Sequence, residues 1–174
     1  MTNTRRVTLT AILFAAAMVL SLIEGLLPPL PIPGARFGLS NIPVMYALIA
    51  MGPGSSMAIA VLKAGFALLA RGAAAGLLSL CGGVLAVAAM WLALTLLRDK
   101  NTYVFLSLCG ATAHNLGQWA AVSLLYAGMN LLSYLPLLLA AGVAAGLVTA
   151  VLLRTVMPLL SRFAQQKRQY PPRS

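Results

Sequence analysis

Residues 5–27 read RRVTLTAILFAAAMVLSLIEGLL, in which two arginines precede an almost unbroken apolar run. A transmembrane helix needs about 20 mostly apolar residues, and Thr8–Leu27 has this length. A cleaved signal peptide also begins with basic residues, but its apolar core is shorter and an A-x-A site precedes a polar mature region. Neither of these features is found here. We therefore expect a first transmembrane helix at Thr8–Leu27, with a signal peptide as the less favoured alternative.

The composition of the whole chain is typical of a membrane protein. Apolar residues make up 61% of the 174 residues and charged residues 8%, against about 45–50% and about 25% in soluble domains. We predict an all-α integral membrane protein with six transmembrane helices in a single domain over residues 1–160. A basic cytoplasmic tail at 161–174 is expected to be disordered. The five further spans are predicted at residues 37–51, 57–69, 77–97, 103–126 and 134–157.

Two of these spans are unusually short. The segment PPLPIPGAR at 28–36 has four prolines and a glycine, so it is expected to be a loop. The following stretch, 37–51, would be only about 22 Å long as a helix. It must therefore be extended by its neighbours, lie in a thinned bilayer or pack inside the protein. The GPGSS at 52–56 separates it from the second short segment, and a re-entrant hairpin formed by both segments is the alternative to two spans.

The basic residues predict the orientation, because Lys and Arg concentrate in cytoplasmic loops. Six spans place both termini on one side, with nine basic residues near the membrane on that side and two on the other. The nine are Arg5, Arg6, Arg98, Lys100, Arg154, Arg162, Lys167, Arg168 and Arg173, and the two are Arg36 and Arg71. We predict cytoplasmic termini in a bacterial plasma membrane. The net charge of +10 favours anionic lipids over nucleic acid, because the basic residues flank apolar runs.

Several kinds of catalytic site lack the residues they need. Glu24 and Asp99 are the two acidic residues of the chain, too few for a paired-carboxylate hydrolase or a calcium site. Cys81 and Cys109 lie in apolar stretches without a second Cys or His at metal-ligand spacing, so we interpret them as packing residues. The chain has no P-loop motif for ATP hydrolysis. We expect a protein that is not an enzyme and that needs no cofactor and no metal.

The charged groups in or near the spans require an explanation. Placing a charged side chain at the membrane centre costs about 2.5 kcal/mol or more of insertion free energy. Glu24 lies near the outer end of the first span, where it can pair with Arg36, bind a ligand or simply face water. Lys63 lies too deep to reach an interface fully by extending its side chain, so we expect it to line a polar cavity. Arg71 follows eight residues later and can face the same cavity from another depth. Two cations without matching carboxylates favour an anionic ligand or a shared Glu24.

A second polar group lies in the segment AHNLGQW at 113–119. His114 and Gln118 are four residues apart on one helical face, and Asn115 is adjacent. These side chains are candidates for ligand binding, and the alternative is hydrogen bonding between helices. Small residues in the first span, Ala11 and Ala15, form a stripe suited to close packing with another helix or another chain.

Three stretches of the sequence resemble a known family. They are SLIEGLLPPLPIPGARFGLSNI at 21–42, SLCGGVLAVAAMWL at 79–92 and GATAHNLGQ at 110–118. The family is described as heptaprenyl diphosphate synthase component I, and is also called the Gx transporter family. Its members resemble the substrate-binding S components of energy-coupling-factor (ECF) transporters. The resemblance extends from Ala11 to about Leu153.

The resemblance implies a six-helix membrane fold that binds a vitamin-class substrate from outside, under a gating loop that corresponds to 28–36. It also implies that the alanine stripe, at Ala11 and Ala15, docks against a transmembrane coupling subunit. Together with Glu24 and Arg36, the implied pocket candidates are Asn41, Lys63, Arg71, His114, Asn115 and Gln118.

We therefore predict a substrate-binding subunit of an uptake transporter for a small, anionic or amphipathic molecule. A transmembrane coupling protein and ATPase subunits would supply the energy. The alternative is a noncatalytic membrane subunit of a heptaprenyl diphosphate synthase or of a quinone- or flavin-linked redox complex. Prenyl transfer itself needs aspartate-rich clusters that hold magnesium against the diphosphate, and this chain lacks them.

Overall fold

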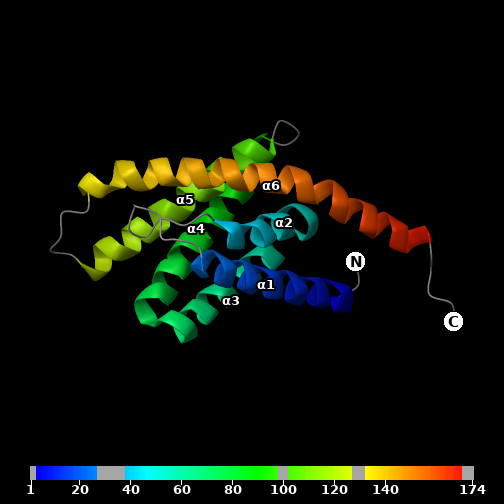
Figure 1. The fold of residues 1–174 in the computed structure, drawn as a ribbon, viewed down its shortest axis with the longest axis horizontal. Helices are drawn as coiled ribbons and strands as arrows, with labels where there is room; N and C mark the ends of the chain where they lie inside the picture. The colour runs from blue at the N-terminus through cyan, green and yellow to red at the C-terminus, as the bar shows by residue number, and fades with distance from the viewer. Residues whose placement is uncertain (1–2, 27–37, 98–101, 127–131, 170–174) are drawn as a thin grey trace.

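The computed structural model describes residues 3–26, 38–97, 102–126 and 132–169, with side chains described as far as Thr155. Within these residues all regular secondary structure is helical, as predicted (Figure 1). The elements are α1 (Asn3–Leu26), the 3-10 turn η1 (Leu39–Asn41), α2 (Ile42–Met51), α3 (Pro53–Arg71), α4 (Ala73–Leu97), α5 (Tyr103–Leu125), the 3-10 turn η3 (Leu132–Tyr134) and α6 (Leu135–Gln169).

Four helical segments in the described part of the chain are long and apolar enough to cross a membrane. They are α1, α3, α4 and the segment Leu132–Thr155, which contains the first part of α6. The helix α5 has 23 residues, about 34 Å at 1.5 Å per residue, but it carries the polar segment around His114. The ten residues of α2 are too few to span. The chain is thus a helical membrane protein, and the count of six spans stays a prediction.

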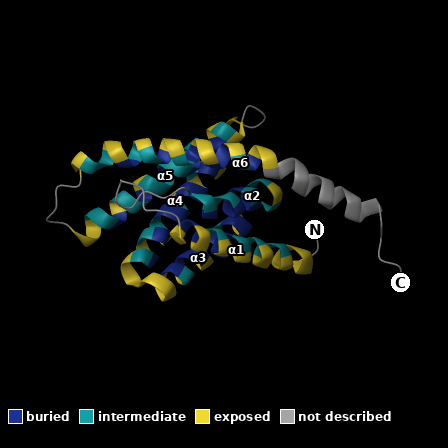
Figure 2. Ribbon diagram, in the orientation of Figure 1, coloured by how far each residue is buried: buried dark blue, intermediate teal, exposed yellow. Residues whose placement is uncertain are grey.

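The short helix α2 lies in the interior of the bundle. Two faces of α2 are buried, and each belongs to a different apolar cluster. Val44 and Ala47 pack in one cluster with residues of α1, α3 and α4, such as Ile59. Met45 and Leu48 pack in the other cluster with residues of α4, α5 and α6. Of the three expectations for this segment, packing inside the protein is therefore the one observed (Figure 2).

The outer faces of the helices remain apolar and exposed. Figure 2 shows exposed residues along the outside of α1, α3 and α6, and they include Leu26, Leu69 and Val151. A soluble monomer rarely exposes large contiguous apolar patches, whereas lipid tails are a suitable environment for such faces. The burial pattern therefore agrees with a protein surrounded by lipid.

Helices that are consecutive in the chain pack against each other from α2 to α6, and α1 packs against α2 and α3. The beginning of α1 and the end of α6 lie at the same end of the bundle (Figure 1), which we call the termini end. At this end the Arg6 guanidinium donates to the Met51 carbonyl oxygen (3.0 Å) and to Ser55 Oγ (3.2 Å). Arg6 thereby connects α1 to the junction of α2 and α3. The opposite end, where α1 stops and α4 begins, is called the pocket end.

Two turns differ from the sequence-based boundaries. The helix α3 begins at Pro53, four residues before the expected start, because proline fits the first turn of a helix. The GPGSS segment is therefore a turn at Gly52 followed by helix. Gly72, with φ of 91°, separates α3 from α4 in a backbone conformation that favours glycine. Four residues later, Gly76 packs against Leu68 of α3.

The last helix is longer than expected. The sixth span was expected to end near residue 157, yet the backbone of α6 is helical to Gln169. The helix continues past Pro158, a residue that disfavours a helix interior, and residues 159–169 contain neither glycine nor proline that would end it. This part of the expected tail is thus helical where disorder was predicted, and residues 170–174 lie outside the described residues.

Candidate functional site

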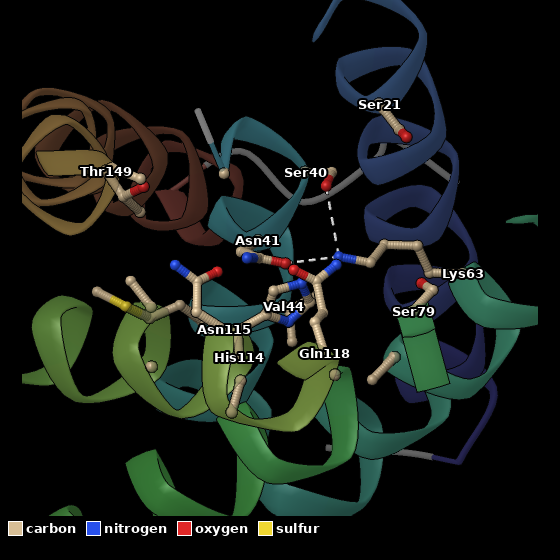
Figure 3. Close-up of a pocket in the computed structure, with 18 of the residues that line it drawn as sticks. Ser21, Ser40, Asn41, Val44, Lys63, Ser79, His114, Asn115, Gln118 and Thr149 are labelled. Carbon is tan, nitrogen blue, oxygen red and sulfur yellow. Dashed lines mark hydrogen bonds between the residues drawn. The ribbon is translucent and has the colours of Figure 1, made fainter. Parts of the chain in front are cut away.

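A cavity of about 170 Å³ lies between the helices and extends from the pocket end toward the middle of the bundle. All six α-helices and η1 contribute to its lining. Figure 3 shows polar side chains from several of these elements directed into the same space. Val44, Met45 and Met90 supply apolar lining deeper in the bundle. A pocket with an apolar part and a few convergent polar groups is the usual form of a small-molecule site.

Lys63 projects from α3 into this cavity and is only 6% exposed. Its ammonium group donates to Asn41 Oδ1 at 2.5 Å and to Ser40 Oγ at 3.4 Å (Figure 3). Both acceptors belong to η1, which follows Gly38 in a left-handed conformation with φ of 77°. Both of these acceptors are neutral oxygens, and the ammonium group lies among the residues that line the cavity.

Glu24 lies at the pocket end of α1 and is 7% exposed. Its Oε1 accepts a hydrogen bond from the Gly38 backbone N–H at 2.5 Å. Its Oε2 is buried and has no hydrogen-bond partner within the described part of the chain. The expected partner Arg36 and the predicted gating loop at 28–36 lie outside the described residues.

Arg71 lines the cavity from the last residue of α3 and is exposed. Lys63 is buried two turns earlier on the same helix. The structure thus places these two cations at different depths of one pocket. With Glu24 they make the wall formed by α1 and α3 the charged side of the site.

The opposite wall is formed by polar groups of α5. His114, Asn115 and Gln118 all line the cavity, and Gln118 points toward Lys63 and Asn41 (Figure 3). Asn115 Nδ2 donates to the Leu138 carbonyl oxygen of α6 at 2.7 Å, so this side chain also connects two helices. The helix-contact interpretation of the AHNLGQW segment therefore applies to Asn115, whereas ligand binding by the cavity-lining side chains stays a prediction.

Close contacts between backbones set the position of α5. A Cβ at Gly117 would lie 2.5 Å from the carbonyl oxygen of Cys81, and one at Gly82 would lie 2.8 Å from His114 Cε1. A Cβ at Gly142 of α6 would lie 2.6 Å from Asn115 Nδ2. These glycines allow α4 and α6 to approach α5 closely and hold its polar side chains against the cavity.

Five hydroxyl groups of the pocket were not predicted from the sequence. They are Ser21, Ser40, Ser79, Ser107 and Thr149, all buried. Serine and threonine also occur in membrane helices as hydrogen-bonding contacts, so no sequence pattern distinguishes a pocket hydroxyl. Ser107 illustrates this second role, because its Oγ donates to the Gly146 carbonyl oxygen of α6 at 2.7 Å.

The predicted docking stripe lies on the surface. Ala11 and Ala15 of α1 are both exposed, and the exposed strip continues at Val19. By contrast, the small residues Gly142 and Gly146 of α6 face α5 within the same chain. The stripe on α1 is thus available to lipid or to another protein.

A comparison with family models identifies the relatives of the chain. The model described as heptaprenyl diphosphate synthase component I matches residues 13–156. The chain belongs to this family. No curated protein and no solved structure matches it. The family resemblance seen in the sequence is therefore confirmed, and the match contains every described pocket residue from Ser21 to Thr149.

The described residues of this heptaprenyl diphosphate synthase component I family member do not form a recognisable metal centre. No group of three or more His, Cys, Asp or Glu side chains that could hold a metal occurs among the described residues. Cys81 and Cys109 are free thiols, and Asp99 lies outside the described part of the chain.

Proposed function

We propose that this protein is the membrane-embedded substrate-binding subunit of an uptake transporter, similar to the S components of ECF transporters. It would capture a small anionic or amphipathic molecule and depend on separate subunits for energy. The observation that carries the proposal is the cavity, which contains the buried Lys63 and is lined by all six helices. Charged groups inside membrane proteins generally mark substrate or ion pathways.

The size of the cavity limits the ligand. Its volume of about 170 Å³ is close to the roughly 150 Å³ of an engineered protein cavity that binds benzene. In this conformation the site therefore fits a molecule with about one ring. Polar groups on both walls would orient such a molecule, while the methionines and valine below would contact its apolar part.

The proposal includes an orientation and a partner surface. The basic residues at the termini end favour a cytoplasmic position for this end, so the pocket would open to the outside of a bacterial plasma membrane. The exposed Ala11 and Ala15 would form the contact with a transmembrane coupling protein, which in turn binds ATPase subunits. Small side chains allow the close helix approach that such a contact needs.

A second function is favoured by the description of the family, which names a component of heptaprenyl diphosphate synthase. In this alternative the chain would be a noncatalytic membrane subunit that anchors a synthase or, less directly, a quinone- or flavin-linked redox complex. Noncatalytic is the appropriate term because Glu24 and Asp99 are the two carboxylate side chains of the chain. Prenyl transfer needs a cluster of such groups to hold magnesium.

Affinity purification of the tagged protein from its native membrane in mild detergent distinguishes the two functions. We expect a transmembrane coupling protein and paired ATPases to copurify and to be identified by mass spectrometry. Recovery of a soluble prenyl synthase or a redox subunit instead would contradict the transporter proposal and support the second function.

The same purification tests the docking surface. Ala15→Leu adds a large side chain to the stripe and should release the coupling protein. Ala58→Leu is the matched control, because Ala58 is an exposed alanine on α3 outside the stripe. An intact complex with Ala15→Leu, or equal loss with both variants, would rule out this stripe as the contact.

A further inference from the structure

The carboxylate of Glu24 has one oxygen that no described group satisfies. Oε1 accepts the Gly38 N–H, whereas Oε2 is buried and makes no hydrogen bond within the described residues. The side chain lines the cavity and is 7% exposed. An ionised carboxylate can accept about four hydrogen bonds, so most of its acceptor capacity is unused.

A buried carboxylate in this state favours a particular kind of neighbour. Removing a charge from water is costly unless the charge is paired and hydrogen-bonded. The carboxylate accepts and does not donate, so a ligand group that approaches Oε2 from the cavity must be a hydrogen-bond donor. A protonated nitrogen is the strongest such donor, because it supplies the opposite charge as well.

The other charged groups of this wall have the opposite sign. Lys63 and Arg71 line the same cavity, and both are donors without acceptor capacity. The bonds of Lys63 to Ser40 and Asn41 go to neutral oxygens, which an anionic ligand group could replace with a stronger charge-assisted bond. The wall thus offers one anionic acceptor and two cationic donors within a single small cavity.

We propose that the site selects small bipolar molecules, which carry both an anionic group and a protonated nitrogen. The anionic group contacts Lys63 and Arg71, and the nitrogen donates to Oε2 of Glu24. This inference rests on the proposed function as a ligand-binding subunit and narrows its substrate class. A purely anionic molecule of the same size leaves Oε2 without a donor and binds more weakly.

Matched sets of small molecules test this selectivity. One set is 4-(aminomethyl)benzoate, 4-methylbenzoate and 4-methylbenzylamine, and a second is 6-aminohexanoate, hexanoate and hexylamine. The purified protein is dialysed to equilibrium against the mixture, and the retained compounds are measured by mass spectrometry. We expect at least one aminocarboxylate to be retained at least tenfold over the carboxylate and the amine of its own set.

The variant Glu24→Gln provides the decisive comparison. Its amide keeps an oxygen that can accept the Gly38 N–H. An NH₂ donor replaces Oε2, the acceptor offered to the ligand nitrogen. The preference for the aminocarboxylate should fall to about onefold, while retention of the plain carboxylate persists. Gly25→Ala is the control, because a Cβ at Gly25 has no described atom within 4 Å; it should keep the wild-type preference.

The outcomes separate the inference from the proposed function. Equal retention of carboxylate and aminocarboxylate by the wild type would overturn the bipolar selectivity alone. Equal loss of both compounds in Glu24→Gln would also overturn it, since Glu24 would then act only by holding the segment at Gly38. Retention of none of the compounds by the folded wild-type protein would contradict ligand binding at this cavity, and the inference with it.

Discussion

The same helices form two different regions of the bundle, the apolar clusters around α2 and the polar wall of the cavity. Around α2, the described helices α1 to α6 bury apolar side chains in two clusters, and Arg6 connects α1 to the α2–α3 junction. Toward the pocket end, the same helices leave a cavity lined by charged and hydroxyl groups. The clusters hold side chains of neighbouring helices together by apolar burial. The pocket wall adds charged groups such as Lys63, whose burial is costly to the fold.

The largest effect on stability is expected from the packed clusters. Ile59→Ala removes a fully buried side chain from the cluster around α2 and should destabilise the fold by about 2–5 kcal/mol. Thermal unfolding in detergent measures this loss. Leu69→Ala on the same helix is the control, because Leu69 is 88% exposed and should have little effect. Similar losses for both variants would contradict the assignment of the core.

A smaller effect is expected where α4 and α5 touch. A Cβ at Gly117 meets the Cys81 backbone, which cannot move as a side chain can, so Gly117→Ala should cost about 1–3 kcal/mol. Gly65→Ala has open space around it and should instead be neutral or raise the melting temperature, because alanine favours a helix. If the two variants shifted the melting temperature in the same direction, the close contact would not hold the helices together.

Within the pocket, variants of Asn115 and Gln118 distinguish a side chain that connects two helices from one that only lines the cavity. Asn115→Leu removes the bond to α6 and should cost about 0.6 kcal/mol, the average for hydrogen bonds between membrane helices. Gln118 makes no such bond within the described residues, so Gln118→Leu should leave the melting temperature unchanged and reduce retention of the aminocarboxylate probes. Equal destabilisation by both variants would make the whole segment a helix contact.

The smallest effect on stability is expected at the most buried cation. Lys63→Met removes a charge whose burial is costly, so the melting temperature should stay the same or rise, while retention of both anionic probe classes is lost. Dialysis and thermal unfolding of the same preparation measure the two effects. A large fall in the melting temperature with unchanged retention would mean that Lys63 stabilises the fold and does not bind ligand.

Part of the candidate site could be predicted from the sequence. Lys63 was expected to line a cavity because a charge in an apolar segment needs a polar environment, and the structure places it there. The hydroxyl groups such as Thr149 were missed because a hydroxyl in a membrane helix costs too little to be conspicuous. The bond of Asn115 to Leu138 depends on how α5 and α6 are rotated, which local sequence does not specify.

The sequence by itself determined that the chain is a helical membrane protein, because long apolar runs need lipid and a backbone in lipid must satisfy its own hydrogen bonds. It also identified the family. The packing of the helices is needed to place α2 in the interior and to turn Gly142 and Gly146 toward α5. The same packing brings Glu24, Lys63 and Arg71 to one cavity. Each of these depends on contacts between segments far apart in the chain, and such contacts arise from the packing of whole helices rather than from the pattern within one helix.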